Sequence, residues 1–198
     1  MIEAELYERG FIFFEGFVFT DRLRGFLLDN KNYTSETNFK DEPFIETELT
    51  DTDILRDIAK GFPSAFLEQF CRHEIYWQAR RAFKGSYIEP HHDDYSDNPR
   101  GRTGAGQIIV WLVEAPFEGR EFVWGEVVDF SKLPDSYPTA TNTTVQDPKV
   151  FKELGSIKPQ TGQGVIISRL NPIFWHSVSP LLTDTSVVSL KGVLKDRL

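Results

Sequence analysis

Short apolar stretches, broken by Gly, Pro or Asp, follow one another from about residue 74 onward. This pattern is typical of short β-strands. It predicts strands at residues 75–83, 87–90, 107–113, 121–124, 165–168, 174–178 and 187–194. Because no helical pattern separates these stretches, we expect two packed antiparallel sheets, the arrangement of a jelly roll.

The first third of the chain mixes β-rich and helical patterns. Residues 11–19 are rich in Phe and predict a strand or a strand pair. Thr20 or Asp21 can cap one short helix, and Thr50 and Asp53 have capping-box spacing ahead of a second. That second pattern is an apolar stripe of helical period, interrupted by a proline: Ile54, Ile58, Phe62, Phe66 and Phe70. The predicted fold is therefore mainly β (α+β), with N-terminal helices packed on one sheet.

The length of the chain, 198 residues, suits a single domain. We expect residues 1–82 to support a β core formed by residues 83–198. Residues 129–149 are polar and contain several prolines, which predicts a long excursion from the core. Excursions of this length in compact domains often form lids.

The charge balance argues against a nucleic-acid partner. The net charge is −8, from 22 basic and 30 acidic side chains, whereas nucleic-acid binding depends on clustered Lys and Arg. Cys71 is the only cysteine, so no intrachain disulfide can form. No apolar stretch approaches about 20 residues, so we expect no membrane span. A cytoplasmic protein with a small-molecule, amino-acid or peptide/protein substrate is the expectation, and the oligomeric state is left open.

The densest group of candidate metal ligands is the run Glu-Pro-His-His-Asp-Asp at residues 89–94. Residues two apart on a strand point to the same side, so His91 and Asp93 can face one metal ion, with His92 turned away. His92 and Asp94 offer the same spacing one position later. The second imidazole of the predicted site is His176.

Two imidazoles and one carboxylate on one face leave coordination positions open for O2 and an organic co-substrate, which suits Fe(II). Zinc hydrolases also use two His and an acid, but their helical H-E-x-x-H signature is absent. A bare H-x-D triplet is a weak signal, and a surface turn explains it equally well. A buried core histidine beside Trp175 is the corresponding structural explanation for His176.

The residues around these ligands resemble the Fe(II)/2-oxoglutarate-dependent oxygenases, in particular their prolyl-hydroxylase-like branch. In that family an aromatic residue and a glycine precede a strand ending in H-x-D, as at residues 83–93. A strand and a glycine-containing turn with acidic and aromatic residues follow, as at 107–113 and 117–122. The motifs P-x-x-G-x-x-hydrophobic and H-x-V-x-P come last, as at 159–167 and 176–180. The motifs keep their order over more than half of the chain.

The resemblance implies a double-stranded β-helix with Fe(II) held between its sheets by His91, Asp93 and His176. It also implies a dioxygenase that binds 2-oxoglutarate and O2, releases succinate and CO2, and hydroxylates an unactivated C–H bond. The aspartate ligand argues against halogenation, because the halogenases of the family leave that position open for halide. The resemblance does not identify the substrate, since one fold serves many substrates.

The sequence departs from the family where 2-oxoglutarate is anchored. Members place an Arg or Lys about ten residues after the second histidine, and this base pairs with the distal C5 carboxylate. The chain has Thr185 and Ser186 there, and Lys191 is the nearest base on the same strand. Alternation places Lys191 on the opposite face from Ser186 unless the strand has a bulge. We rank Lys191 first as the anchor, with Ser186 as a further hydrogen-bond donor.

Other candidate residues are softer. Arg169 ranks second and Arg102 third as the anchor, and Arg120 occupies a turn position where the family often has glycine. A solvated surface charge is the ordinary alternative for all three arginines. The remaining candidates for lining the co-substrate site are Tyr87, Gln107 and Trp111, with core packing as the alternative for the tryptophan.

Two other classes of protein remain as alternatives. The first is another metal-binding jelly-roll enzyme of the cupin type, which usually carries H-x-H and a later glutamate. The second is a non-catalytic metal-binding module, favoured only by the missing base near Ser186.

Overall fold

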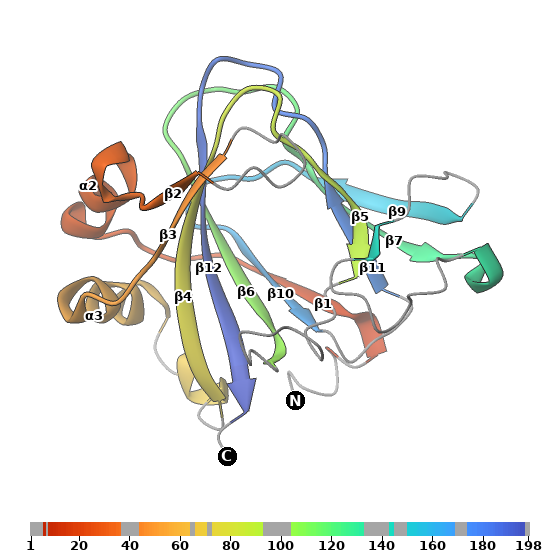
Figure 1. Cartoon of the computed structure of the whole chain (residues 1–198). Coiled ribbons are helices and arrows are strands. Elements are labelled where there is room, and N and C mark those ends of the chain that lie inside the picture. Colours follow the sequence, from red (N-terminus) through yellow and green to blue (C-terminus); the bar gives the residue numbers. More distant parts are fainter. Residues whose placement is uncertain are drawn as a thin grey trace.

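In the computed structural model, residues 6, 8–36, 44–63, 66–70, 73–92, 104–132, 143–144, 150–168 and 174–196 are described. They form two antiparallel sheets that face each other, with two helices on the outer side of the larger sheet (Figure 1). The fold class is therefore mainly β, as predicted. Among the described residues no helix is both long and apolar enough to cross a membrane.

The larger sheet has seven strands. Its order is β1 (Phe11–Phe14), β10 (Gly164–Ser168), β6 (Gly104–Val113), β12 (Val187–Asp196), β4 (His73–Ala82), β3 (Phe44–Glu48) and β2 (Ser35–Glu36). The smaller sheet has five strands, in the order β8 (Thr143–Thr144), β5 (Ile88–His92), β11 (Phe174–Val178), β7 (Phe122–Val127) and β9 (Phe151–Ile157).

The chain passes between the two sheets repeatedly, from β4 to β5, β5 to β6, β6 to β7, β9 to β10, β10 to β11 and β11 to β12. This winding is a double-stranded β-helix, which the resemblance implied. β4 lies inside the larger sheet between β12 and β3, although its residues precede position 83. The β-helix therefore begins earlier in the chain than the expected core.

The two helices begin at side-chain caps. Thr20 accepts a hydrogen bond from the backbone N–H of Leu23 and caps α2 (Asp21–Leu28), as predicted. Asp51, not Thr50, caps α3 (Thr52–Gly61), where it accepts from two backbone N–H groups of the first turn. α3 ends at Gly61 because the residue before a proline disfavours helical dihedrals, and Phe62 is extended ahead of Pro63.

The rest of the predicted apolar stripe lies outside α3. Phe66 precedes the short 3-10 helix η2 (Leu67–Phe70) and Phe70 ends it, and both rings remain in the same core. Two more 3-10 turns are η1 (Asn30–Asn32) and η3 (Phe130–Lys132). Residues 11–19 contain one strand, β1, rather than a pair.

Separate apolar clusters fill the spaces on either side of the larger sheet. The cluster behind it, between the sheet and the helices, includes Leu23, Leu27 and Ile58, all completely buried. The cluster between the sheets includes Trp111 and Phe174. β10 is buried on both faces, and it therefore reads as a nearly continuous apolar run.

The connections β4–β5 (residues 83–87), β6–β7 (114–121) and β11–β12 (179–186) lie together at one end of the β-helix, at the top in Figure 1. We call this the hairpin end. Backbone hydrogen bonds join these connections, among them Gly85 N–H to Leu181 O (2.7 Å) and Leu182 N–H to Glu118 O (2.9 Å). The hairpin end therefore holds the two sheets in a fixed register.

Candidate metal and co-substrate site

His91 and His176 lie directly opposite each other on the neighbouring strands β5 and β11. Their ring centroids are 4.2 Å apart, with an interplanar angle of 55°. Directly opposed residues of an antiparallel pair point to the same face. That face is the interior, because Phe174, two residues before His176, packs in the cluster between the sheets. Both histidines are buried, at 8% and 5% exposure.

A one-residue bulge in β5 sets the orientation of His91. The register passes from His176–His91 to Val178–Ile88, so β5 has one more residue than β11 between these pairs. The bulge falls at Glu89 and Pro90, and proline suits it because proline has no N–H for the ladder. His91 Nδ1 lies 2.8 Å from the carbonyl oxygen of Glu89. A carbonyl can only accept, so Nδ1 carries the proton and Nε2 keeps its lone pair for a metal.

Two aromatic rings fix the plane of the His176 imidazole. Phe122 stacks on it with centroids 5.5 Å apart and planes 24° apart, and Phe174 stacks at 6.0 Å and 20°. Trp111 in turn packs against Phe122, at 6.0 Å. His176 is thus a packed core side chain and also faces His91, so its core position is compatible with ligation.

His92 lies on the other face of the smaller sheet. Its ring is 6.3 Å from that of Trp175, which is completely buried in the outer cluster with Val127 and Val150. The alternative pair of His92 with Asp94 therefore begins on the face away from His176. Asp93 and Asp94 lie outside the described residues. The described residues alone bring together no group of three His, Cys, Asp or Glu side chains that could hold a metal.

Lys191 faces the interior from the larger sheet. It lies opposite Ile109 of β6 and Gln78 of β4. The register of β12 is regular from Val187 to Leu194, and the even-numbered residues Val188 and Leu190 pack against the helices. Alternation therefore directs Lys191 toward the space between the sheets.

Ser186 has a different environment from the one expected. Its hydroxyl accepts a hydrogen bond from Arg81 Nε at 2.9 Å. The same guanidinium donates from Nη1 to the Leu28 carbonyl (2.6 Å) and to Asn30 Oδ1 (2.7 Å), at the end of α2 and in η1. Ser186 thus belongs to a link between the larger sheet and the helix layer, away from the histidines.

Arg120 is buried at the hairpin end, so the alternative explanation of a solvated surface charge is wrong for this arginine. It is 6% exposed, and its Nη1 donates to both the carbonyl and the hydroxyl of Ser86, each at 3.2 Å. Its φ of 55° is the left-handed conformation that glycine adopts most easily, which explains the family's preference for glycine there. Its backbone N–H donates to Pro180 O at 3.0 Å. Arg120 therefore joins three connections.

Of the remaining predicted residues, Gln107 faces the interior and Tyr87 does not. Gln107 is 2% exposed and lies in register with Ile167 and Val193 on the interior face. The register of the bulged strand places Ile88 opposite Val178, so alternation directs Tyr87 to the other side. Arg169 and Arg102 lie outside the described residues, as does most of 129–149. The described part of that excursion includes β8, which pairs with β5 beside His91 and His92.

One interior base was not predicted. Arg80 of β4 lies opposite Ser189 of β12 and Glu46 of β3, and its side chain is 25% exposed. Its Nη2 donates to Glu46 Oε2 at 3.1 Å, and its guanidinium lies 4.4 Å from the centre of the Phe44 ring. The sequence predicts a strand here, but the adjacent Arg80 and Arg81 occupy opposite faces. The residue pattern does not show which of the two arginines points inward.

Comparisons with solved structures identify the fold. A 2OG-Fe(II) oxygenase-family oxidoreductase from Burkholderia pseudomallei is similar over 97% of this chain and 88% of its own, with TM-score 0.61 and 17% identity. A Pseudomonas putida prolyl-4-hydroxylase matches over 98% and 97%, with TM-score 0.58 and 14% identity. HygX from Streptomyces hygroscopicus, with nickel, 2-oxoglutarate and hygromycin B bound, matches over 99% and 86%, with TM-score 0.61 and 11% identity.

The chain has the fold of the 2OG-Fe(II) oxygenases. No family model and no curated protein sequence matches it. At 11–17% identity the likeness between these proteins is one of fold, and the chemistry has to be argued from the residues of this chain.

Proposed function

We propose that the chain is an Fe(II)- and 2-oxoglutarate-dependent dioxygenase that hydroxylates a C–H bond of its substrate. One observation carries the proposal: His91 and His176 are buried, directly opposed and face the interior of an oxygenase-type β-helix. A carboxylate, Asp93, follows His91 at the spacing of a two-histidine, one-carboxylate iron site.

The two imidazoles suit a resident metal ion. The Glu89 carbonyl holds His91 in the tautomer that leaves Nε2 for the metal, and Phe122 and Phe174 keep the His176 ring in one plane. His91, Asp93 and His176 would hold Fe(II), which supplies the one-electron chemistry that O2 requires. The protein orients the co-substrate and keeps the site dry, since apolar residues line much of the interior.

Lys191 is the proposed partner of the 2-oxoglutarate C5 carboxylate. It reaches the interior from β12, whereas Ser186 bonds to Arg81 on the other side of the sheet. An ammonium group in a partly buried position stabilises a carboxylate more strongly than it would in water. Arg169 remains the second candidate by sequence. Gln107 offers a buried amide on the same face.

The proposed substrate is an amino acid, a peptide or protein side chain, or a small molecule. One structural neighbour is a prolyl hydroxylase in complex with a hypoxia inducible factor peptide fragment, and another has hygromycin B bound; both support a substrate of this class. The choice within this class rests on residues beyond the two histidines.

Anaerobic titration calorimetry tests the proposal. We expect Mn(II), as a redox-inactive stand-in for Fe(II), to bind at one site per chain, and 2-oxoglutarate to bind only when the metal is present. With Fe(II) and O2, slow succinate formation should follow. Metal binding without 2-oxoglutarate binding would instead support a cupin-like enzyme or a non-catalytic metal-binding module.

A further inference from the structure

A second cation, which the sequence analysis did not predict, lies near Lys191 on the interior face of the larger sheet. Arg80 is one strand away, opposite Ser189, the residue two before Lys191. Diagonal neighbours of this kind have Cβ atoms about 7–8 Å apart, within reach of two long side chains. The two cations can therefore contact one small anion between the sheets.

The Arg80 guanidinium is held in place but keeps donors to spare. Glu46 accepts from Nη2, and the Phe44 ring lies under the guanidinium plane. Nε is buried and has no hydrogen-bond partner in the part of the chain that the structure describes. A buried N–H without a partner costs free energy, so such a group is a reason to look for a ligand.

Ring contacts between the two sheets show which residues of the larger sheet lie at the same height along the strands as the histidines. Directly opposed residues of neighbouring strands form a row across the larger sheet. One such row consists of Phe13, Val165, Ile109 and Lys191, and the Phe13 ring is 5.2 Å from that of Trp124. Trp124 is the residue opposite His176 on β7. The row that contains Lys191 is therefore level with the two histidines.

Arg80 lies one row further toward the hairpin end. Its row includes Ser189 and Trp111, and the Trp111 ring is 6.0 Å from that of Phe122, the residue opposite Val178. Successive rows on one face of a sheet are about 7 Å apart. This spacing is of the same order as the extended length of a five-carbon dicarboxylate.

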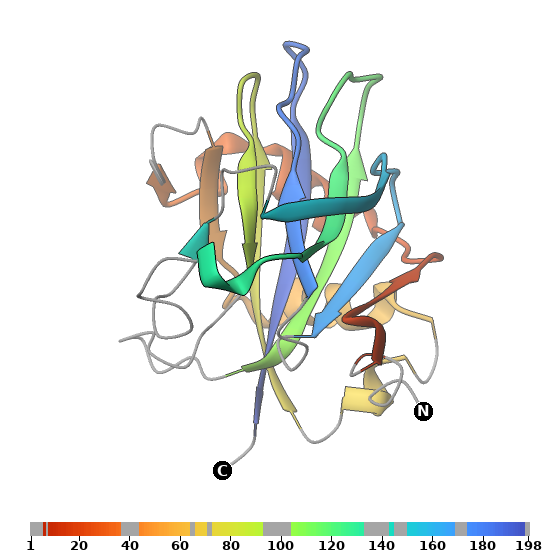
Figure 2. The same ribbon diagram turned by 90° about the vertical axis from the view of Figure 1, so that its right-hand side faces the viewer.

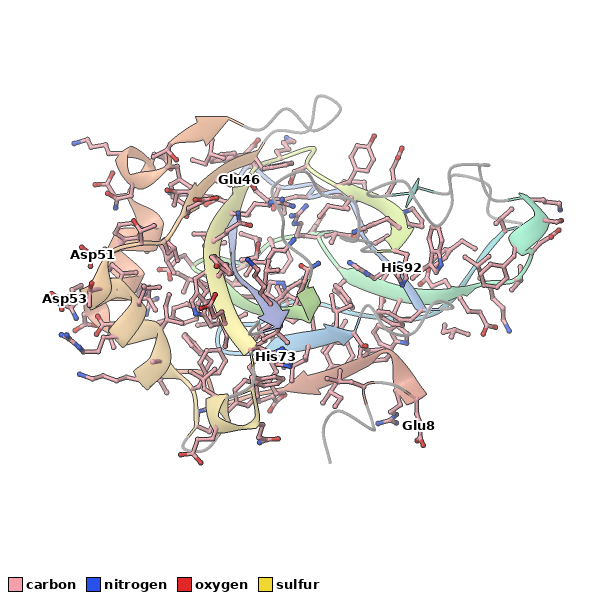
Figure 3. The ribbon with its side chains drawn as sticks, turned by 60° about the horizontal axis from the view of Figure 1, so that its bottom comes forward. Glu8, Glu46, Asp51, Asp53, His73 and His92 are labelled. Carbon is pink, nitrogen blue, oxygen red and sulfur yellow. The ribbon has the colours of Figure 1, made fainter. Side chains whose placement is uncertain are left out.

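The strands that carry the two cations also lie across the interior from the strands that carry the histidines. In Figure 2, viewed from the side of the smaller sheet, the yellow-green strands β4 and β5 lie one in front of the other, as do the blue strands β11 and β12. β4 carries Arg80 and β5 carries His91. Figure 3 shows Glu46, the partner of Arg80, beside β4 and across the interior from β5 and His92.

We propose that Arg80 and Lys191 together bind the distal carboxylate of the co-substrate, with Arg80 donating from Nε–H. The inference rests on the proposed function, because it needs a 2-oxo acid whose oxo end binds at the histidines. Glu46 and Phe44 are positioning residues that hold the guanidinium. The anchor is then shared between β12 and β4.

Two 2-oxo acids of the same chain length test the proposal. 2-Oxopentanoate has the same oxo-acid end as 2-oxoglutarate but a methyl group in place of the distal carboxylate. The measurement is the dissociation constant of each acid with the Mn(II)-loaded protein under anaerobic conditions. The ratio of the two constants reports the distal carboxylate alone, because binding at the metal end is common to both.

Arg80→Gln should weaken 2-oxoglutarate binding about tenfold or more, while 2-oxopentanoate binding stays within about threefold of the wild type. Arg80→Lys keeps a cation for Glu46 but lacks the Nε–H. It should lower the ratio of the 2-oxopentanoate dissociation constant to that of 2-oxoglutarate by about threefold or more. This variant tests the proposal even if the glutamine variant folds poorly. Arg81→Gln is the matched control. It removes the neighbouring guanidinium, which contacts Ser186 and Leu28 on the other face, and should leave the ratio unchanged.

An unchanged ratio in both Arg80 variants would overturn the inference, and so would an equal loss of affinity for the two acids. Wild-type protein that binds Mn(II) but neither acid would overturn the proposed function instead. The two failures are therefore distinguishable.

Discussion

The two adjacent histidines of β5 have opposite surroundings. His91 faces His176 in the interior, and His92 faces Trp175 on the outer side of the smaller sheet. Each is buried to the same extent, at 8% exposure. Burial therefore does not distinguish the proposed ligand from its neighbour, whereas the direction of the side chain does.

Replacement of one histidine at a time tests this difference. His176→Ala should abolish Mn(II) binding and metal-dependent succinate formation, because one imidazole fewer leaves an incomplete site. His92→Ala, the matched control, should keep metal binding within about threefold of the wild type, although the loss of packing on Trp175 lowers stability. Calorimetry measures the first effect and urea unfolding the second. Retained turnover in His176→Ala would refute the assignment of the ligands.

Arg120 shows how one residue can serve two needs at the hairpin end. Its backbone has the left-handed conformation, and its side chain bonds to Ser86 in the neighbouring connection. Glycine would satisfy only the backbone, and most other residues would satisfy neither.

A pair of variants separates these contributions. Arg120→Ala should lower the free energy of unfolding by about 1–3 kcal/mol, because it removes two buried hydrogen bonds and keeps the strained backbone. Arg120→Gly should be about 1 kcal/mol more stable than the alanine variant, since glycine relieves that strain. Urea denaturation measures both values. Equal stability of the two variants would contradict the role of φ.

At the scale of elements, an ion pair joins α2 to α3. Arg22 donates from Nε and Nη2 to the two carboxylate oxygens of Asp57, at 2.7 and 2.8 Å, and Thr20 donates its hydroxyl at 2.9 Å. Asp57 has a side-chain exposure of 7%, and Arg22 of 49%. The cap of one helix and the middle of the other are thus linked through one carboxylate.

This link gives a pH dependence to the stability. The hydrogen bonds from Arg22 lower the pKa of Asp57 from 3.8 to about 2, against the opposing effect of burial. A carboxyl whose folded pKa is depressed stabilises the fold above its unfolded pKa, and the stabilisation is lost as the pH falls through the folded value. Asp57→Asn should therefore unfold more easily than the wild type at pH 7, and the difference should shrink between about pH 4 and pH 2.

Urea unfolding at several pH values measures the difference. Asp53→Asn is the control, because Asp53 is about half exposed and its ion pairs with Arg22 and Arg56 contribute little. A difference that stays constant down to pH 2 would show that the Asp57 carboxylate is not the source.

At the scale of the molecule, the described residues form three layers, in which the larger sheet separates the helices from the candidate site (Figure 1). The helix layer packs on the outer face of that sheet, and the histidines face its inner face. The layers are coupled through the strands, whose alternate residues point into the two cores.

A cavity in the helix layer should test how independent the two sides are. Ile58→Ala should cost about 2–5 kcal/mol of unfolding free energy, since Ile58 of α3 is completely buried. Mn(II) affinity of the folded protein should change by less than about twofold, because no described metal-site residue contacts this cluster. Calorimetry on protein shown to be folded by circular dichroism checks the affinity. A large loss of affinity would mean that the layers are coupled more tightly.

Local pattern was enough to predict most strands of the β core. The alternation in β5, the capped start of α2 and the positions of β4–β7 and β10–β12 all depend on neighbours in the sequence. β2, β3, β8 and β9 were not predicted. β9 forms an edge of the smaller sheet, where no strict alternation is required, and β3 lies next to the two-residue edge strand β2. Residues 129–149 remain predicted only as an excursion.

The sequence by itself determined which residues could bind a metal, through the order of motifs around His91, Asp93 and His176. Only the tertiary structure decided that His91 and His176 are directly opposed, because strands far apart in sequence had to pair first. It also decided that Arg80 faces the interior and Arg81 the helices. Alternation separates two neighbouring arginines, but only packing against the other layers determines which face is inside.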